Sequence, residues 1–113
     1  NIDKDKIAGV LVNLLSNAAK YTPSGGTVRL RVELESDSIQ MQVEDTGIGI
    51  AAEELPRLFD KFFRSHDTRV QEISGSGLGL AFSREVARLH GGEISISSEL
   101  NVGSRFTLTL PLN

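Results

Sequence analysis

Two asparagines and a lysine recur on one side of a predicted helix near the start of the chain. Asn13 and Asn17 are one helical turn apart, and Lys20 follows three residues later, so the three side chains are surface neighbours. Asparagine disfavours helix interiors because its amide competes for backbone hydrogen bonds. An amide oxygen can ligate Mg²⁺, and a lysine offers positive charge to phosphate. The set could hold a hydrated Mg²⁺ and a phosphate, although a solvated helix face would give the same pattern.

Two glycine-containing segments offer a second kind of chemistry. Residues 45–49 read Asp-Thr-Gly-Ile-Gly directly after a predicted strand. A carboxylate there can accept from an exocyclic amine such as that of adenine, and glycine lets a backbone approach a flat ring or take a positive φ. In residues 75–79, glycine stands at every second position before a helix, which exposes N–H groups to an anion. A plain turn and a flexible hinge are the corresponding structural alternatives.

The elements that would position these groups follow from hydrophobic periodicity. Apolar residues at helical spacing predict a helix from about Ile7 to Ala18, ended by residues 22–26. Strict alternation predicts a half-buried strand over 28–34, and an antiparallel partner through residues 39–43 follows a turn at 36–38.

The second half of the chain repeats this pattern of helix and hairpin. A short helical stretch is expected at about 51–60, and the polar residues 64–75 are typical of a mobile loop. Leu78, Phe82, Val86 and Leu89 mark a second long helix, and alternation after it predicts another hairpin. The expected fold class is α+β, a two-layer sandwich with helices on one face of a largely antiparallel sheet.

Composition limits the classes of function. The chain has 113 residues, a net charge of −3 and no cysteine. One domain over residues 1–113 is expected. The negative charge disfavours a basic nucleic-acid surface, and the absence of cysteine excludes thiolate metal sites. Direct membrane insertion is disfavoured because no apolar run approaches the roughly 20 residues that span a bilayer.

The order of the motifs resembles the catalytic, ATP-binding domain of sensor histidine kinases. Residues 13–23 resemble the N box, 45–50 the G1 box, 58–64 the F box and 75–80 the G2 box, and the closing segments 89–92 and 103–111 also match. The resemblance covers nearly the whole chain. It implies the Bergerat fold of the GHKL ATPases, which include gyrase B, Hsp90 and MutL. That fold has a mixed, mostly antiparallel sheet, about three helices on one face and a mobile ATP lid, here at about residues 64–75.

The resemblance also implies roles toward ATP and Mg²⁺. Asn17 matches the principal Mg²⁺ ligand with Asn13 beside it, Asp45 would accept from the adenine amine, and Arg64 would approach the γ-phosphate. The implied catalytic residues are Asn13, Lys20 and Arg64. The implied cofactor-binding residues are Asn13, Asn17, Lys20, Tyr21, Asp45, Gly47, Ile48, Gly49, Gly75, Ser76, Gly77, Leu78, Gly79, Leu80 and Ser104.

Residues outside that set receive structural expectations. The aromatic residues Phe59, Phe62 and Phe63 are expected to pack the base of the lid. His66 is expected on the lid surface, and His90 at a helix end.

The residue at position 13 bears on the reaction. Hydrolysing relatives carry a glutamate there, whereas Asn13 cannot abstract a proton. Phosphoryl transfer to a nucleophile on another domain therefore fits better than hydrolysis. The resemblance places the phosphoacceptor histidine on a dimerisation domain and a response regulator downstream. The chain alone is expected to bind ATP without autophosphorylating.

The setting and the alternatives complete the expectation. A cytoplasmic fragment is expected, and a membrane-anchored parent kinase is compatible with it. The chain begins abruptly on charged residues, as though excised from a longer protein. The family domain usually opens with one more strand before Asp3, so the sheet here is expected to lack an edge strand or the fragment to start late. The alternative functions are a serine kinase or anti-sigma switch of the same fold, and a nucleotide-binding regulator without activity.

Overall fold

The computed structural model describes residues 3–71 and 79–112. The elements in chain order are α1 (Lys4–Lys20), β1 (Val28–Leu34), β2 (Ser38–Asp45), the 3-10 helix η1 (Ala52–Arg57), α2 (Thr68–Gln71), α3 (Gly79–Leu89), β3 (Glu93–Glu99) and β4 (Gly103–Pro111).

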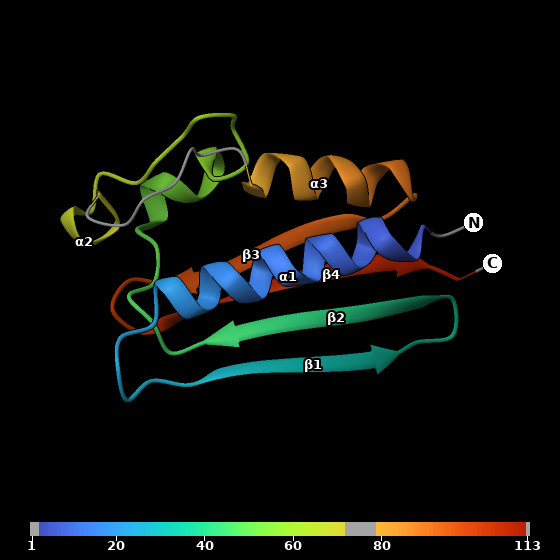
Figure 1. Ribbon diagram of the computed structural model, residues 1–113, viewed down its shortest axis with the longest axis horizontal. Coiled ribbons are helices and arrows are strands. Elements are labelled where there is room, and N and C mark those ends of the chain that lie inside the picture. The colour runs from blue at the N-terminus through green and yellow to red at the C-terminus, as the bar shows by residue number, and fades with distance from the viewer. Residues whose placement is uncertain (1–2, 72–78, 113) are drawn as a thin grey trace.

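The strands form one sheet in the order β1-β2-β4-β3, and each neighbouring pair in the described residues is antiparallel. Helices α1 and α3 lie on the same face of this sheet, as Figure 1 shows. The predicted α+β two-layer sandwich is therefore confirmed.

Helix α1 begins and ends where its sequence provides caps. Asp3 is the N-cap, and its Oδ1 accepts from the backbone N–H groups of Asp5 and Lys6, both at 3.1 Å. Tyr21 follows the last turn as the C-cap. The helix buries the face formed by Ile7, Val10, Leu14 and Ala18. Its polar residues at positions 13 and 17 are thereby left on a different face, which is half-buried.

The hydrophobic core lies between the two long helices and the strands β2, β4 and β3. Val43 of β2, Leu108 of β4 and Ala87 of α3 are fully buried. The core also contains Ile7, Val10, Leu14, Ala18, Val86, Ile94, Phe106 and Leu110. Burial on this scale fixes the position of α1 and α3 over the sheet.

Strand β1 differs from its sequence prediction. Alternation predicted a half-buried strand, but all seven residues of β1 are exposed. Its apolar residues range from 38% exposed at Val28 to 74% at Leu34. The reason is its place at the sheet edge, because the helices and the core lie over β2, β4 and β3.

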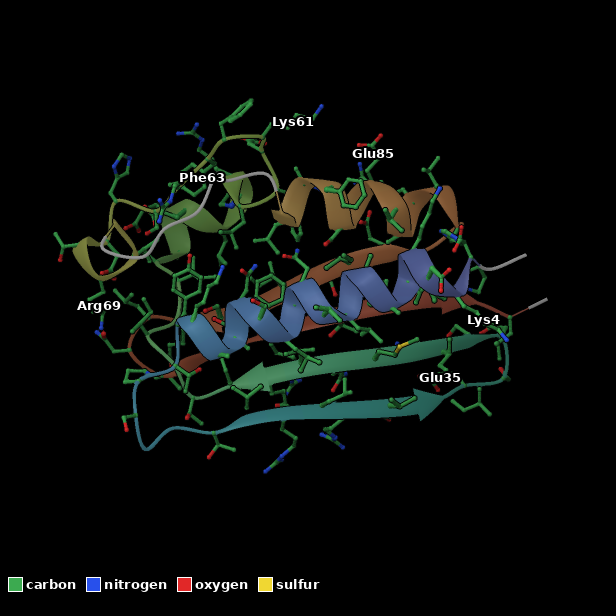
Figure 2. All side chains as sticks on the ribbon, in the orientation of Figure 1. Lys4, Glu35, Lys61, Phe63, Arg69 and Glu85 are labelled. Atoms are coloured by element: carbon green, nitrogen blue, oxygen red, sulfur yellow. The ribbon has the colours of Figure 1, made fainter. Side chains whose placement is uncertain are left out.

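Helix α3 buries a face other than its most apolar stripe. Phe82 is 65% exposed and Leu89 is 74% exposed, whereas Ser83, Val86 and Ala87 are buried. Because α3 contacts both α1 and the sheet, the small residues Ser83 and Ala87 suit the close approach of a second helix. Glu85 lies on the side of α3 that faces away from the sheet (Figure 2).

The aromatic residues before position 64 only partly fill their expected role. Phe59 and Phe63 are half-buried, and each carries an arginine guanidinium over its ring, from Arg84 at 4.8 Å and from Arg57 at 4.9 Å. Phe62 instead has a φ of 66° and is 70% exposed. Phe62 therefore does not pack the base of the lid as expected, because most of its side chain is exposed at this turn.

Candidate functional site

A cavity of about 300 Å³ opens at the end of the sandwich where α1 and β2 end. Five segments line it: the C-terminal half of α1, the end of β2 with the loop after it, residues 58–70 after η1, the start of α3, and the start of β4. The described lining residues are Asn13, Asn17, Ala18, Lys20, Tyr21, Asp45, Ile48, Gly49, Ile50, Leu58, Phe63, Arg64, Ser65, Val70, Gly79, Leu80, Ser104 and Phe106. A cavity of this volume is within the range of small-molecule sites.

Helix α1 supplies the polar side of this cavity. Asn13, Asn17 and Lys20 all line it, so the polar helix face singled out from the sequence does face the cavity. The two asparagines are half-buried, whereas Lys20 is exposed at the last turn. Tyr21 is half-buried, and its carbonyl accepts from the backbone N–H of Ile48 at 3.1 Å. This bond ties the end of α1 to the loop after β2.

The Asn13 amide is held by a residue that the sequence did not single out. Its Nδ2 donates to the Oγ of Ser83 at 2.8 Å, and Ser83 is 1% exposed. A Cβ atom added to Gly79 would lie 2.9 Å from the Oδ1 of Asn13. The amide oxygen therefore faces the start of α3. One signal could have revealed Ser83, since it stands three residues from both Leu80 and Val86, on the buried face of the helix.

Asp45 ends strand β2 as a half-buried carboxylate. Its Oδ1 accepts from the backbone N–H of Gly47 at 2.9 Å and from that of Ser104 at 3.3 Å. The antiparallel register places Asp45 opposite Ser104, which explains the second bond. Burial raises the pKa of Asp45, and the two backbone hydrogen bonds offset only part of that rise. Because both bonds go to Oδ1, Oδ2 can accept from a ligand.

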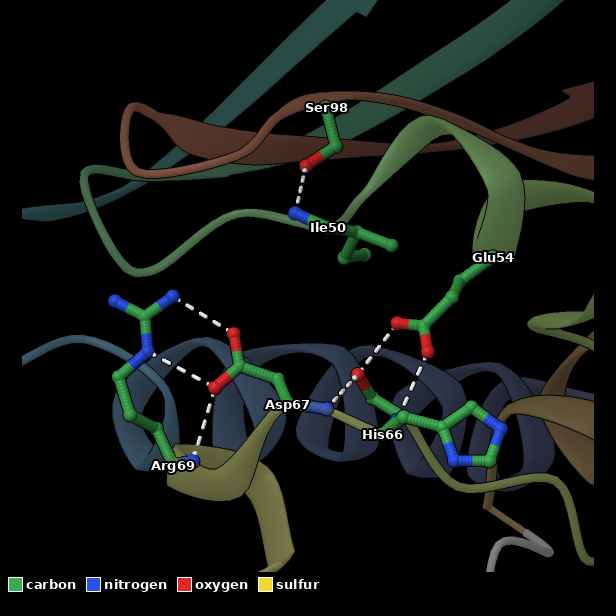
Figure 3. Close-up of polar contacts among 7 residues, drawn as sticks. Ile50, Glu54, His66, Asp67, Arg69 and Ser98 are labelled. Atoms are coloured by element: carbon green, nitrogen blue, oxygen red, sulfur yellow. Dashed lines mark hydrogen bonds and ion pairs between the residues drawn. The ribbon is translucent and has the colours of Figure 1, made fainter.

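Ser104 lines the cavity and also supports Asp45 through its backbone N–H. Its hydroxyl pairs with the hydroxyl of Ser98 at 2.8 Å, and Ser98 also donates to the carbonyl of Gly103. The backbone N–H of Ile50 donates to the same Ser98 Oγ at 2.9 Å, as Figure 3 shows. The loop after β2 is thus bonded to the end of β3.

Gly47 and Gly49 lie so close to other parts of the backbone that neither position has room for a Cβ atom. A Cβ atom at Gly47 would lie 2.3 Å from the carbonyl oxygen of Tyr21. Gly49 has a φ of 69°, and a Cβ atom there would lie 2.0 Å from the carbonyl oxygen of Glu99. Of the two reasons for glycine that the sequence offered, a positive φ is found at Gly49, and at both positions the chain's own backbone lies close. That these glycines also shape a nucleotide pocket stays a prediction.

Arg64 reaches the cavity from the segment after η1. One guanidinium nitrogen, NH2, donates to the carbonyl of Val70 at 2.8 Å, so the side chain crosses the turn formed by residues 65–70. Ser65 and Val70 line the cavity beside it.

The sequence-predicted site residues are mostly brought together. Residues 13, 17, 20, 21, 45, 48, 49, 64, 79, 80 and 104 line the cavity, while Gly47 is buried nearby without lining it. The predictions for Gly75, Ser76, Gly77 and Leu78 lie outside the described residues. Apolar lining residues such as Ile50, Leu58 and Phe106 were missed, because a sequence pattern does not separate a cavity wall from the core.

The two histidines are placed as expected. His66 is exposed. His90 directly follows α3, and there its Nδ1 bonds the carbonyl of Val86 at 2.8 Å and its Nε2 accepts from the backbone N–H of Asp3 at 3.1 Å. Neither histidine lines the cavity.

Two further properties concern the described residues as a whole. They contain no group of three or more histidine, aspartate, glutamate or cysteine side chains that could hold a metal ion. None of the helices in residues 3–71 and 79–112 has the length and hydropathy of a membrane span.

Comparison with known families assigns this architecture to a class of ATPase domains. The family described as "Histidine kinase-, DNA gyrase B-, and HSP90-like ATPase" matches residues 2–113. The chain belongs to this family.

The similar proteins are sensor histidine kinases. The chain is 41% identical over 112 residues to the sensor histidine kinase WalK of Bacillus subtilis, covering 97% of this chain and 18% of WalK. It is 41% identical over 116 residues to CusS of Escherichia coli K12, covering 96% of this chain and 24% of CusS. The chain thus spans less than a quarter of the length of these relatives.

Solved structures show the same fold. The mycobacterial sensor histidine kinase MprB superposes with a TM-score of 0.86 at 32% identity, over 96% of this chain and 74% of that one. Full-length ShkA in complex with AMPPNP superposes with a TM-score of 0.81 at 31% identity, over 96% of this chain and 22% of ShkA.

Proposed function

We propose that this chain binds Mg²⁺-ATP and donates the γ-phosphate to a histidine on a separate dimerisation and phosphoacceptor domain. The observation that carries the proposal is one cavity in which Asn13, Asn17 and Lys20 of α1 meet a half-buried Asp45. Membership of the ATPase family and the sensor histidine kinases among its relatives support it. The reaction would take place in the cytoplasm and serve two-component signalling, with a response regulator as the next acceptor.

The cavity provides different chemistry at its two sides. Asp45 has a carboxylate oxygen available to accept from the adenine amino group, and its backbone partners hold that carboxylate in place. On α1, Lys20 would attract phosphate oxygens, and Tyr21 would flank the nucleotide. Ile48 and Leu80 add apolar surface for the base or ribose. This division fits a nucleotide, which has a flat amine-bearing base at one end and charge at the other.

The residues of α1 also fit a magnesium ion. Asn17 and Asn13 offer neutral oxygen ligands, which hard cations accept and which add no repulsion against a triphosphate. Magnesium bound there would neutralise phosphate charge and orient the triphosphate. The Nδ2 of Asn13 donates to the Ser83 hydroxyl, so the amide oxygen of Asn13 is the atom that would bind the ion or its waters.

The lining residues favour transfer over hydrolysis. Asp45 is the one carboxylate among the described residues that line the cavity, and its Oδ1 is already occupied by backbone N–H groups. Position 13 carries an amide, which cannot take a proton from water. The nucleophile and any base assisting it would come from another domain, and Arg64 would stabilise charge on the transferred phosphoryl group.

Calorimetric titration and a transfer assay test the proposal. An ATP analogue should bind the chain in the presence of Mg²⁺ and bind more weakly with EDTA. Labelled ATP should leave no phosphate on the chain alone, and should yield acid-labile phosphohistidine when the parent's phosphoacceptor domain is added. Absence of nucleotide binding would refute the site, and binding without transfer to that domain would refute the kinase activity.

A further inference from the structure

Glu54 fastens the segment that follows Phe63 to the 3-10 helix η1. Its Oε1 accepts from the hydroxyl of Ser65 at 2.5 Å, and its Oε2 accepts from the backbone N–H of His66 at 2.8 Å. Figure 3 shows the Glu54 carboxylate reaching from η1 to His66. Both oxygens of a half-buried carboxylate are therefore used to hold two consecutive residues of one segment.

The hydrogen bonds continue from this point to α2. The Ser65 Oγ accepts from the backbone N–H of Asp67 at 3.1 Å. Asp67 in turn accepts from Arg69 at its backbone N–H, at 2.9 Å, and at its guanidinium, at 3.0 and 2.7 Å. This series, visible in Figure 3, gives residues 65–69 a defined shape whose attachment to η1 is Glu54.

Arg64 is the residue whose position depends on this attachment. On its N-terminal side, Phe63 is half-buried and carries the Arg57 guanidinium 4.9 Å above its ring. On its C-terminal side, Ser65 is bonded to Glu54. The Arg64 side chain lines the cavity and donates to Val70, which lies beyond the same turn. The backbone of Arg64 is thus fixed from both sides, and Glu54 provides the polar half of that fixation.

We propose that Glu54 is a positioning residue for phosphoryl transfer, acting by holding Arg64 at the mouth of the nucleotide cavity through its bonds to Ser65 and His66. This inference rests on the proposed function, because it gives Arg64 the γ-phosphate as its target. Glu54 does not itself line the cavity. Its loss should therefore slow transfer while leaving recognition of the nucleotide nearly unchanged.

The geometry also explains why a carboxylate is needed. Ser65 O–H and His66 N–H are both donors that point at one side chain, and only a carboxylate offers an acceptor oxygen to each. A glutamine would place its NH₂ group against one of them. With the amide oxygen facing the His66 N–H, the NH₂ group would face the Ser65 hydroxyl, which could then no longer donate its proton to residue 54.

The test compares transfer rate with nucleotide affinity in the full-length kinase. Variants Glu54→Ala and Glu54→Gln are matched with Glu53→Ala, since Glu53 is the adjacent acidic residue of η1, is exposed and takes no part in the bonds described above. At saturating ATP, the Ala variant should transfer about tenfold more slowly or worse, given what small displacements cost in positioned reactions. Its dissociation constant for an ATP analogue should stay within about twofold, and Glu53→Ala should match wild type in both measurements.

A double-mutant cycle with Arg64→Ala separates positioning from a general structural effect. If Glu54 acts through Arg64, the double variant should be no slower than Arg64→Ala alone. Additive losses, or a Glu54→Ala rate equal to that of Glu53→Ala, would overturn the proposal. Ser65→Ala should also transfer slowly, whereas Ser65→Thr, which keeps the hydroxyl, should transfer at the wild-type rate. These two variants keep the test decisive if Glu54→Ala folds poorly.

Hydrogen exchange distinguishes failure of this inference from failure of the proposed function. Without nucleotide, Glu54→Ala should speed exchange of the His66 and Asp67 amides, and Glu53→Ala should not. Unchanged exchange would overturn the anchoring even in an active kinase. The other outcome is that Glu54→Ala does speed exchange but the wild-type kinase neither binds ATP nor transfers its phosphate. That result would refute the proposed function, and with it the role of Glu54 in transfer.

Discussion

At the scale of single residues, Asp45 shows how neighbours prepare a polar group for a ligand. Burial makes its charged form costly, and two backbone N–H groups on one oxygen compensate only in part. The ionised carboxylate is therefore less favourable in the folded chain than it would be in water. A ligand amine at the other oxygen would satisfy it, which is the pattern expected of a binding residue.

Substitution Asp45→Asn tests this balance. The folded-state pKa of Asp45 is raised, so ionisation disfavours the folded chain as pH rises through that pKa. The free energy of unfolding of the variant, relative to wild type, should therefore increase from acidic to neutral pH in denaturant titrations. Preference for adenine over guanine nucleotides should fall by about tenfold or more, because the amide oxygen would stay with the Gly47 and Ser104 N–H groups and an NH₂ group would replace the acceptor that faces the ligand.

Asp37→Asn is the control for this variant. Asp37 is an exposed residue in the turn between β1 and β2, so its substitution should change neither the pH dependence nor the nucleotide preference. A retained adenine preference in Asp45→Asn would contradict the ligand contact.

At the scale of elements, the loop after β2 is shaped by the turn that joins β3 to β4. Ile48 accepts from the backbone N–H of Asn101 at 2.6 Å, and Ile50 donates to Ser98. Gly49 lies between these two bonds with a positive φ, against the Glu99 backbone. The segment that carries Asp45 into the cavity is therefore held from the opposite end of the chain.

Substitution Gly49→Ala should destabilise the fold by about 2 kcal/mol or more, because a Cβ atom would meet backbone and the left-handed φ is strained. Gly9→Ala is a control of opposite sign. Gly9 lies within α1 with open space around it, so alanine should raise stability by about 1 kcal/mol through helix propensity. Chemical denaturation measures both values, and equal effects would contradict the assigned role of Gly49.

At the scale of the whole molecule, the helical layer is joined to the sheet by charge as well as by the core. Glu93 at the start of β3 bonds the guanidinium groups of Arg84 and Arg88 on α3, at 3.1 and 3.0 Å. Burial alone would raise the pKa of Glu93, but hydrogen bonds from Arg88, the Ile94 N–H and Arg84 together lower it. These side chains are partly exposed, so the contribution of the pair to stability is modest.

Substitution Glu93→Gln should lower the thermal midpoint near neutral pH. Because the folded-state pKa is lowered, the stability that Glu93 adds is present above its unfolded pKa and is lost as pH falls through the folded value. The difference from wild type should thus shrink on acidification. Glu85→Gln, on the far side of α3, should show no such pH dependence, and a constant difference for Glu93→Gln would contradict the ion-pair account.

The sequence by itself determined much of this protein. Periodicity predicted α1 and both hairpins, and the two asparagines with Lys20 were singled out from helical spacing alone. These features are local, because capping, alternation and i,i+4 neighbours depend on residues close in the chain. The roles assigned to these residues toward ATP stay predictions.

Only the tertiary structure decided the remainder. Ser83 holds Asn13 across 70 positions of the chain, and Glu54 holds a segment whose sequence has no periodicity at all. The exposure of β1 and of Phe82 depends on which elements cover them, and the glycines after Asp45 are required by Tyr21 and Glu99. The physical reason is the same in each case, since the space and the hydrogen-bond partners of these residues come from elements distant in sequence.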